Sequence, residues 1–280
     1  MNQRYADLHV HTYFSDGTFS PEEVVRTAKE KGLAAIAICD HDSVDGISPC
    51  IKLAGEELEI IPGVELTVIK ERREVHVLGY FVSWEEKWFV DTLKDLQEKR
   101  VKRMRKMIEK LAHHGIDIDA EELLEESGQG SVGRLHLARK MAQTGQIPTL
   151  QTAFDKYIGD LKPCYVEDVG FEATQAVDTI IRAGGVPVIA HPGILGNDDL
   201  VRKFIRYGIR GIEAFHIDQS SSVSKKYQKM AEENNLLITG GSDCHGLAKK
   251  EVLMGKVKVP YPVVERLKEE RDRIRNKSAG

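Results

Sequence analysis

Short apolar runs alternate with helix-like segments along most of this 280-residue chain, and no other feature constrains its fold as strongly. The apolar runs cover residues 5–10, 34–39, 60–69, 75–82, 186–190, 209–215 and 236–239. Helical patterns cover residues 21–32, 171–183, 200–207 and 224–234, and the first begins at an N-cap, Ser20, followed by Pro21. Strand–helix alternation of this kind favours a mainly parallel sheet with helical crossovers. We therefore predict an α/β fold, a distorted barrel of seven strands.

The alternation stops between residues 91 and 163, where strand patterns disappear. Leu96, Met104, Ile108 and Leu111 recur there at helical spacing. We therefore expect a catalytic barrel formed by residues 1–90 and 164–280, and an inserted helical subdomain, residues 91–163, that lies over the barrel mouth. The charged stretch 265–277 is expected to form a surface helix.

Composition excludes several classes of protein. The formal net charge of -4 argues against a protein that coats nucleic acid through bulk positive charge. We find no secretory signal and no stretch near the ~18 apolar residues of a membrane span. The four cysteines show no paired spacing and suit a reducing compartment. These features predict a cytoplasmic protein that does not bind membranes, and no obligate protein partner is evident.

Nine residues of the types that bind divalent metals lie within or just beyond these apolar runs. Six are histidines, out of ten in the chain, and three are carboxylates. In chain order they are His9, His11, Asp16, His41, Glu65, His76, His191, Asp243 and His245. Neutral imidazoles and carboxylates are ligands that Zn, Mn and Fe share. Because nine ligands exceed the needs of one ion, we predict a cluster of two or three divalent ions (Mn, Fe or Zn).

Strand geometry explains how these residues would meet. Parallel barrels place chemistry at the carboxyl ends of their strands, and His9 and His11, two residues apart, point to the same side. Glu65 lies inside an apolar run, where an unpaired carboxylate would be costly. A single histidine at a strand end is more often a polar cap, but nine ligand-type residues disfavour that interpretation. Neighbouring carboxylates expected to orient the imidazoles are Asp7, which also fits a plain strand start, Asp40 and Asp42.

The ordered set resembles the polymerase and histidinol phosphatase (PHP) family. The resemblance covers residues 7–246 and is carried by Asp-Leu-His-Val-His-Thr with Asp16, Asp-His-Asp, Pro-Gly-Val-Glu, the strand histidine, Ala-His-Pro and Ser-Asp-x-His. It implies a distorted seven-stranded β/α barrel with a trinuclear metal site. It also implies the ligands of each ion: His9, His11, Glu65 and Asp243 for one, Glu65, His76 and His191 for a second, and Asp16, His41 and His245 for a third.

The insert carries a motif that points toward nucleotide substrates. Ser131 suits an N-cap of a helix that ends near Gln143, and a helix start with an arginine offers donors to a phosphate. A capped surface helix with an incidental arginine fits equally well. Two segments resemble motifs of a PHP subgroup that hydrolyses 3′,5′-bisphosphonucleotides and trims 5′-phosphorylated RNA: Gly-Arg-x-His-Leu-Ala-Arg at residues 133–139 and Lys-Pro-x-Tyr-Val at residues 162–166. This resemblance implies that Arg134 and Lys162 hold a substrate phosphate, with His136 close by.

Two further features leave alternatives open. His216 is retained, but the subgroup's His-Pro-x-His-type segment is not, so His216 either protonates a leaving oxygen or only lines the pocket. Residues 99–110 carry seven Lys and Arg residues. They form either a solvated face or, through Arg100 and Arg103, a surface that steers a phosphate backbone.

Together, these features predict a metal-dependent phosphoesterase that acts through a metal-activated hydroxide. The expected substrates are 3′,5′-bisphosphonucleotides such as pAp, short 5′-phosphorylated RNA degraded in the 5′-3′ direction, or both. The alternatives are another PHP hydrolase, such as histidinol-phosphate phosphatase, or a non-catalytic regulatory PHP module. A regulatory module would typically have lost ligands, whereas this chain has the whole set.

Overall fold

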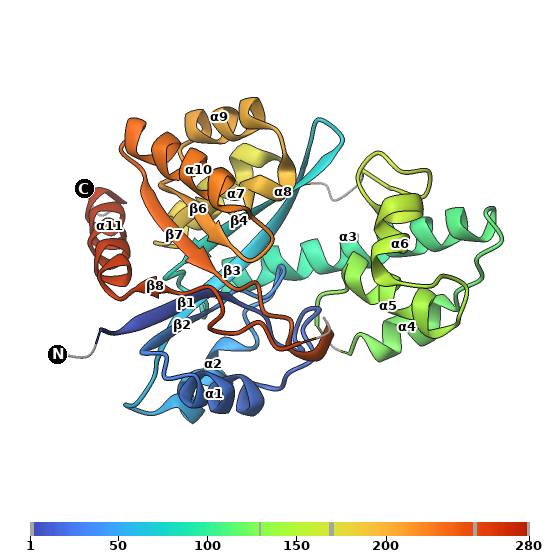
Figure 1. Cartoon of the computed structure of the whole chain (residues 1–280), viewed down its shortest axis with the longest axis horizontal. Helices are drawn as coiled ribbons and strands as arrows, with labels where there is room; N and C mark the ends of the chain where they lie inside the picture. The colour runs from blue at the N-terminus through green and yellow to red at the C-terminus, as the bar shows by residue number, and fades with distance from the viewer. Residues whose placement is uncertain (1–2, 129, 168–170, 249–250, 279–280) are drawn as a thin grey trace.

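A mixed eight-stranded sheet wrapped by helices forms the larger part of the molecule (Figure 1). The computed structural model describes residues 3–128, 130–167, 171–248 and 251–278. Neighbouring strands follow the order β7-β6-β5-β4-β3-β2-β1-β8. The strands are β1 (Tyr5–Val10), β2 (Ala35–Ile38), β3 (Glu59–Lys70), β4 (Arg73–Tyr80), β5 (Val186–Ile189), β6 (Gly211–His216), β7 (Leu237–Gly241) and β8 (Val259–Pro260). The predicted distorted seven-stranded barrel is confirmed, because β1–β7 correspond to the seven apolar runs.

The chain that leaves β7 lies beside β1, so the sheet nearly closes into a barrel. The His11 amide donates to the Cys244 carbonyl (3.0 Å), and the Cys244 amide donates to the His9 carbonyl (3.3 Å). This closure brings the segment with Asp243 and His245 beside the two β1 histidines. The short β8, which pairs antiparallel with β1, is absent from the sequence prediction because two residues show no alternation.

β3 and β4 form a hairpin, which departs from the parallel arrangement that the sequence predicts. Their two-residue turn consists of Glu71 and Arg72, both left-handed, with φ of 52° and 60°. A two-residue connection can only join antiparallel strands, so β4 runs opposite to both β3 and β5. The beginning of β4, with Glu74 and His76, therefore lies at the same end of the barrel as the carboxyl ends of the parallel strands.

Helices cover the outside of the barrel. They are α1 (Pro21–Glu30), α2 (Ile47–Ala54), α7 (Ala173–Arg182), α8 (Pro192–Leu195), α9 (Asp198–Tyr207) and α10 (Ser221–Glu233). α1 begins as predicted: the Ser20 hydroxyl accepts the Glu23 amide (3.2 Å), and the Glu23 carboxylate accepts the Ser20 amide (2.9 Å). Among the described residues, no helix combines the length and apolarity needed to cross a membrane.

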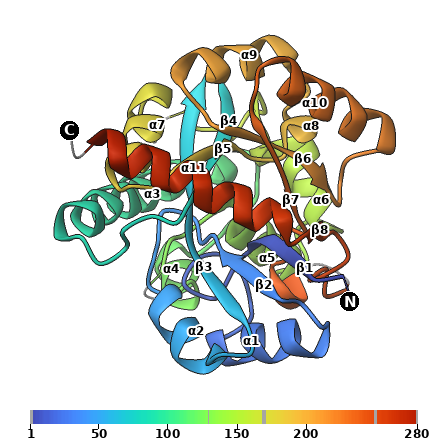
Figure 2. The ribbon, with the colours of Figure 1, turned by 90° about the vertical axis from the view of Figure 1, so that its left-hand side faces the viewer.

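The C-terminal helix α11 (Pro262–Ser278) closes the end of the barrel opposite the predicted ligands. Figure 2 shows it lying across this end. Val264, Leu267 and Ile274 are buried in the same cluster as Leu8 of β1 and Tyr80 of β4. The expected surface helix therefore also seals the inner core. Its few apolar residues are diluted by charged ones, which is why the sequence indicates only a surface helix.

The helical insert has a hydrophobic core of its own. Its elements are α3 (Lys87–Ala112), α4 (Ala120–Glu126), α5 (Arg134–Gln143), α6 (Leu150–Ala153) and a π-helical turn (Phe154–Ile158). The core includes Met104, Leu111, Leu123, Leu137 and Met141. Figure 1 shows α4–α6 at the end of the molecule farthest from α11, with α3 extending from the barrel toward them. The described residues between 87 and 158 include no strand.

The start of α5 differs from the predicted one. The N-cap is Gly133, not Ser131, and the Gly133 amide donates to Nδ1 of His136 (3.1 Å). The Ser131 amide instead donates to the carbonyl of Phe14 (3.0 Å) in the loop after β1. The Ser131 prediction was wrong because this residue ties the segment before the helix to the barrel, an interaction that local sequence does not reveal.

Candidate metal centre

Glu65 of β3 lies at the centre of a group of histidines at the carboxyl-terminal end of the barrel. Its Oε2 atom is 3.2 Å from His9 Nε2, 3.3 Å from His11 Nε2 and 3.2 Å from His41 Nδ1. Asp243 adds an oxygen 3.5 Å from His9 Nε2 and 3.2 Å from His11 Nε2. Atoms of His9, His11, Glu65 and Asp243 all lie within 4.8 Å of one another, as the ligands of one ion would.

The other oxygen of Glu65 faces a second set of ligands. Oε1 is 3.0 Å from Nδ1 of His76 on β4 and 3.1 Å from Nε2 of His191, just after β5. These two ring nitrogens are 3.3 Å apart. His41, Glu65 and His76 form another group with mutual distances that suit an ion. Because its two oxygens face different nitrogen sets, the Glu65 carboxylate is suited to bridge two cations.

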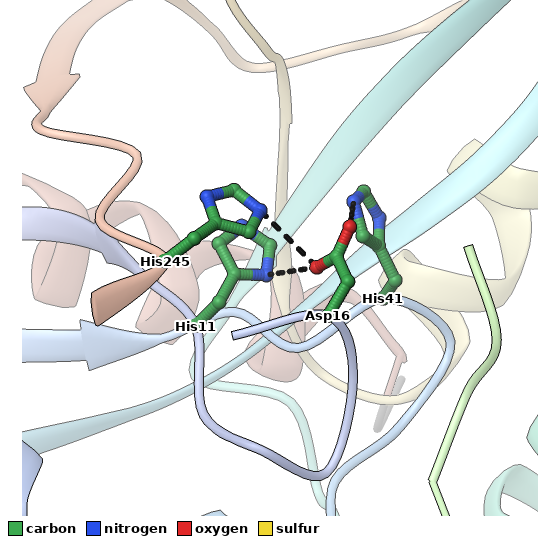
Figure 3. A group of neighbouring side chains, drawn as sticks. All are labelled: His11, Asp16, His41 and His245. Atoms are coloured by element: carbon green, nitrogen blue, oxygen red, sulfur yellow. Dashed lines mark ion pairs between the residues drawn. The ribbon is translucent and has the colours of Figure 1, made fainter. Parts of the chain in front are cut away.

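A third group surrounds Asp16 in the loop after β1 (Figure 3). Asp16 Oδ1 is 3.1 Å from His245 Nε2 and 3.8 Å from His11 Nδ1, and Oδ2 is 3.7 Å from His41 Nε2. The loop turns tightly at Gly17, where a Cβ atom would lie 2.8 Å from the carbonyl oxygen of Thr12. Only glycine fits this approach, so the loop sequence itself places Asp16 over the histidines.

Two predicted ligands have backbones in the left-handed region, which is uncommon for residues other than glycine. φ is 26° at His191 and 51° at Asp243. The amide of His191 is held by Oε2 of Glu213, at 2.8 Å. Such conformations cost free energy and occur often at functional sites, where the surrounding structure maintains them. Two of the nine predicted ligands therefore have conformations that helix or strand geometry alone would not produce.

The donor set fits a cation because several of its buried polar atoms have no hydrogen-bond partner. Among the described residues, this holds for His9 Nε2, His11 Nε2, Asp16 Oδ1, His41 Nδ1 and Glu65 Oε2. Single buried polar atoms without a partner are rare and costly in folded proteins. Here five occur in adjoining groups with the chemistry of divalent-metal ligands. Bound cations would satisfy all five.

Charges within the cluster shift the pKa of most of its groups. Burial raises the pKa of Glu65, but the imidazoles of His41, His76 and His9 outweigh burial and hold it well below its usual range. Burial lowers the pKa of His11 and His76, but the surrounding carboxylates, Glu65 among them, raise it to about 10 and about 9, respectively. A cation competes with these protons for the same nitrogens, so binding a divalent ion should release protons.

The three carboxylates expected to orient imidazoles have a different role. Among the described residues, Asp7, Asp40 and Asp42 make no hydrogen bond or ion pair with an imidazole, so the structure does not show the expected direct contacts, and Asp7 matches its alternative, a hydrogen-bonded strand start. Their partners are Ser242, Gly255 and the His9 amide for Asp7, Thr12 and Ser15 for Asp40, and Arg100 and Thr67 for Asp42. These carboxylates fix the loops that carry the ligands. Asp40 reaches an imidazole only indirectly, because Ser15 Oγ lies 3.4 Å from His11 Nδ1.

Two other carboxylates orient imidazoles, and sequence reasoning missed both. Oε1 of Glu213 on β6 is 3.0 Å from His9 Nδ1, and Oε1 of Glu74 on β4 is 3.0 Å from His76 Nε2. Glu213 is fully buried in an apolar strand. The argument that singled out Glu65, the cost of an unpaired carboxylate inside a strand, would also have found Glu213.

Two arginines of α3, Arg100 and Arg103, are buried instead of solvated or free to steer phosphate. Arg100 pairs with Asp42 (2.5 Å) and donates to the hydroxyl of Thr67. Arg103 pairs with Glu74 (2.6 Å). Both alternatives offered for the basic run are therefore wrong at these positions. The two arginines attach the insert to the barrel, because their partners belong to β3, β4 and the loop after β2.

The predicted phosphate-binding residues lie in different surroundings. Arg134, at the first turn of α5, pairs with Glu74 (3.1 Å) and Asp160 (2.9 Å). His136 is buried, and burial lowers its pKa to about 4, so its imidazole is neutral. Lys162 lies in an exposed turn, and among the described residues its ammonium makes no hydrogen bond or ion pair. Arg134 and His136 border the candidate site, whereas Lys162 is placed at the surface.

Two clefts adjoin the cluster on the side of the insert. One, of about 290 Å³, is lined by His76 and His191 together with Arg134, Phe154 and Asp160. The other, of about 350 Å³, is lined by His136 and Arg139 with Thr18 and Leu247. Arg139 donates to the Asp16 carbonyl (3.4 Å), so the second cleft adjoins the Asp16 group. The site therefore has room for a ligand on two sides.

His216, at the end of β6, points into the cluster. Its Nε2 atom is 3.4 Å from Asp243 Oδ2, and its Nδ1 accepts the amide of Asp218 (3.2 Å). With Nδ1 occupied as an acceptor, a neutral His216 ring carries its proton on Nε2. This position is compatible with both alternatives predicted for His216, a proton donor or a pocket wall.

Comparisons with known proteins agree with this arrangement. A profile of the PHP domain matches residues 7–161. The chain is 31% identical over 247 residues to the 5′-3′ exoribonuclease Rnm of Escherichia coli, covering 85% of this chain and 84% of that protein. It is also 31% identical over 246 residues to a 3′,5′-nucleoside bisphosphate phosphatase of Chromobacterium violaceum, covering 85% of this chain and 86% of that protein.

A solved structure resembles the whole chain, including the insert. It comes from Bifidobacterium adolescentis, is described as a metal-dependent phosphoesterase and superposes with a TM-score of 0.84 at 27% identity. The superposition covers 95% of this chain and 96% of that one. The similarity therefore extends beyond the barrel to both parts of the molecule.

Proposed function

The chain belongs to the PHP domain family and is a metal-dependent phosphoesterase, and on that premise we propose that it hydrolyses 3′,5′-bisphosphonucleotides, 5′-phosphorylated RNA, or both. The relatives named for these two activities align with more than four-fifths of the chain, which supports the substrate class. The complete ligand set argues against a regulatory module. Hydrolysis of histidinol phosphate is the alternative activity, so histidinol phosphate serves as the comparison substrate in the test below.

The observation that carries the proposal is the set of nine predicted ligands gathered at one end of the barrel, with both oxygens of Glu65 facing ring nitrogens. We propose that they hold two or three ions of Mn, Fe or Zn, with Glu65 shared between two of them. The first ion would be held by His9, His11, Glu65 and Asp243, the second by Glu65, His76 and His191, and the third by Asp16, His41 and His245. Divalent ions at such a site stabilise phosphate oxygens and lower the pKa of water.

The protein's own groups would recognise the substrate and carry a proton. Arg134 borders the cleft beside His76 and His191, where a second phosphate of the substrate could replace or join its acceptors Glu74 and Asp160. Lys162, in its exposed turn, would add positive charge if it reached that phosphate. Nε2 of His216 would hold a proton close to the cluster, where the leaving oxygen needs one.

A substrate panel tests the proposal. Purified protein supplied with Mn would be assayed against pAp, 5′-phosphorylated and 5′-hydroxyl oligoribonucleotides, histidinol phosphate and an aryl phosphate. We expect phosphate release from pAp, or mononucleotides from 5′-phosphorylated RNA, at rates well above those on histidinol phosphate. The Asp243→Asn variant, prepared in parallel, controls for contaminating phosphatases. A preference for histidinol phosphate would contradict the proposed substrate class.

A further inference from the structure

Glu74 connects a predicted metal ligand with two arginines of the insert. On one side, its Oε1 is 3.0 Å from Nε2 of His76. On the other side, Oε1 is 3.1 Å from Arg134 Nη2 and Oε2 is 2.6 Å from Arg103 Nη1. The side chain of Glu74 is only 7% exposed. A buried carboxylate with three charged or polar neighbours fixes their relative positions.

The contact with Glu74 determines which nitrogen His76 presents to the cluster. A neutral imidazole has one N–H group and one acceptor nitrogen, and a carboxylate at Nε2 keeps the proton there. In the neutral ring that binding of a cation requires, Nδ1 then keeps its lone pair, and this is the nitrogen that lies 3.0 Å from Glu65 Oε1 and 3.3 Å from His191 Nε2. Without Glu74, neither the tautomer nor the orientation of the ring would be fixed from this side.

The position of Glu74 depends in turn on the insert. Arg103 of α3 is 4% exposed, and its Nε donates to the carbonyl of Val166 (2.8 Å). Asp160, between the π-helical turn and Lys162, accepts both the Glu74 amide (3.2 Å) and Arg134 Nη1 (2.9 Å). Three separate segments of the chain therefore hold Glu74: α3, the start of α5 and the segment with Asp160.

Glu213 provides an internal comparison, because it orients His9 without the insert. Its carboxylate contacts Nδ1 of His9 and the amide of His191, both in the barrel. The carbonyl of Glu213 accepts Gln219, also in the barrel. Of the two carboxylates that orient imidazoles, one is positioned by the barrel alone and the other by the docked insert.

We propose that Glu74 is a positioning residue that makes the His76 side of the metal centre depend on the docked insert. The inference rests on the proposed metal site. It assigns a second role to the insert: besides selecting substrates, the insert holds His76 in the geometry that binds an ion. It also predicts that Arg103, which is not one of the nine predicted ligands, contributes to metal affinity through its ion pair with Glu74.

Metal binding, measured apart from catalysis, tests this inference. Apo protein would be titrated with Mn²⁺ or Zn²⁺ against a competing chelator, and the absorption spectrum of the Co²⁺-loaded protein would be recorded. Glu74→Gln should weaken one class of site roughly ten- to a hundredfold, as is typical when a residue that orients a ligand is changed. It should also change the Co²⁺ spectrum. The matched control is Glu71→Gln, an exposed glutamate in the turn of the same hairpin, which should leave both unchanged.

A second pair of variants tests the dependence on the insert. Arg103→Gln removes the charge that faces Glu74 but keeps a donor, and should weaken the same class of site in the same direction. Arg105→Gln, two residues along α3 on its exposed face, should bind metal like the wild type. If Glu74→Gln does not fold, this pair decides the question alone.

The outcomes separate the two claims. Wild-type protein that binds no divalent ion would overturn the proposed metal site itself. Normal metal affinity and an unchanged Co²⁺ spectrum in Glu74→Gln, even with a lowered melting temperature, would make Glu74 merely structural and overturn the inference alone. Normal affinity in Arg103→Gln would overturn the dependence on the insert.

Discussion

The barrel end and the insert both bury charged side chains, but the two regions satisfy them differently. At the barrel end, ring nitrogens and carboxylate oxygens face one another, and several of those described, five of them on predicted ligands, have no hydrogen-bond partner. In the insert, Arg100, Arg103 and Arg134 each direct donors to a carboxylate and to a backbone carbonyl. The barrel end is a site that still needs cations, whereas each of these arginines already pairs with a carboxylate of the protein, although Arg103 Nη2 has no hydrogen-bond partner among the described residues.

This difference predicts different consequences of substitution. Changes at the barrel end should abolish catalysis with little effect on folding, because the residues there serve the cations. Changes among the buried arginines should first affect the docking of the insert, because their partners lie in the barrel. Changes at the border between the two regions should affect the choice of substrate. The following experiments test the comparison, from the largest expected effect to the smallest.

Asp243→Asn should have the largest effect. It removes a charge beside His9 and His11, and we expect kcat/KM to fall roughly a thousandfold or more, about 4 kcal/mol in transition-state stabilisation. Asparagine tolerates the left-handed backbone found here (φ 51°), so the variant should fold. Steady-state kinetics and a thermal melt measure the two effects. Near-normal activity would show that the cluster does not drive the reaction.

Arg100→Met should unfold the molecule more easily while leaving the barrel ligands in place. The substitution leaves the buried carboxylate of Asp42 without its charged partner, and losing one partner of a buried pair typically costs about 3–5 kcal/mol of stability. Chemical denaturation would measure the loss. The control is Arg105→Met, which removes an exposed pair with Glu121 and should change stability little. Equal stability of the two variants would contradict the view of α3 as a docked helix.

Arg134→Ala should alter the choice of substrate. If Arg134 grips a phosphate that is not hydrolysed, its loss should lower kcat/KM for pAp and 5′-phosphorylated RNA about ten- to a hundredfold, roughly 1.5–3 kcal/mol. Hydrolysis of a simple aryl phosphate should change little. Equal losses on both substrate classes would instead make Arg134 structural, through its pairs with Glu74 and Asp160.

The pH dependence of the metal-free protein should show a smaller effect. The pKa values of His11 and His76, about 10 and about 9, lie above the ordinary value of 6.5. Their contribution to stability is therefore complete below pH 6.5 and is lost as the pH rises toward 9 and 10. We expect the melting temperature of the chelator-treated protein to fall over that range, and Mn²⁺ to suppress the fall. A melting temperature that rises steadily from pH 7 to 10 without metal would contradict the coupled cluster.

The sequence predicts the barrel better than the insert, for a physical reason. The seven main strands and the Ser20 cap follow from local periodicity and capping chemistry, which adjacent residues encode. The nine ligands stand at or near strand ends, so a barrel brings them together without knowledge of individual contacts. Their binding of metal stays a prediction.

Pairings between distant residues are what the sequence does not reveal. Arg100 pairs with Asp42, 58 residues away, and Arg103 pairs with Glu74, about 29 residues away. Because both partners lie on other elements, neither arginine differs in its local sequence from its solvated neighbours. The same applies to Glu74, whose role depends on Arg103 and Arg134 together. The prediction of Ser131 as a helix cap is wrong for the same reason, because the contact of its amide with the Phe14 carbonyl is equally remote.

The central claim is that the nine ligands form one polynuclear metal centre around Glu65. Crystals of the metal-replete protein, measured at the absorption edges of Mn, Fe and Zn, test it most directly through anomalous scattering. We predict two or three peaks, with Glu65 contributing one oxygen to each of two ions, and with His9, His11 and Asp243 around one of those two. Metal-replete crystals with no anomalous peak near His9, His11 and Glu65 would contradict the account.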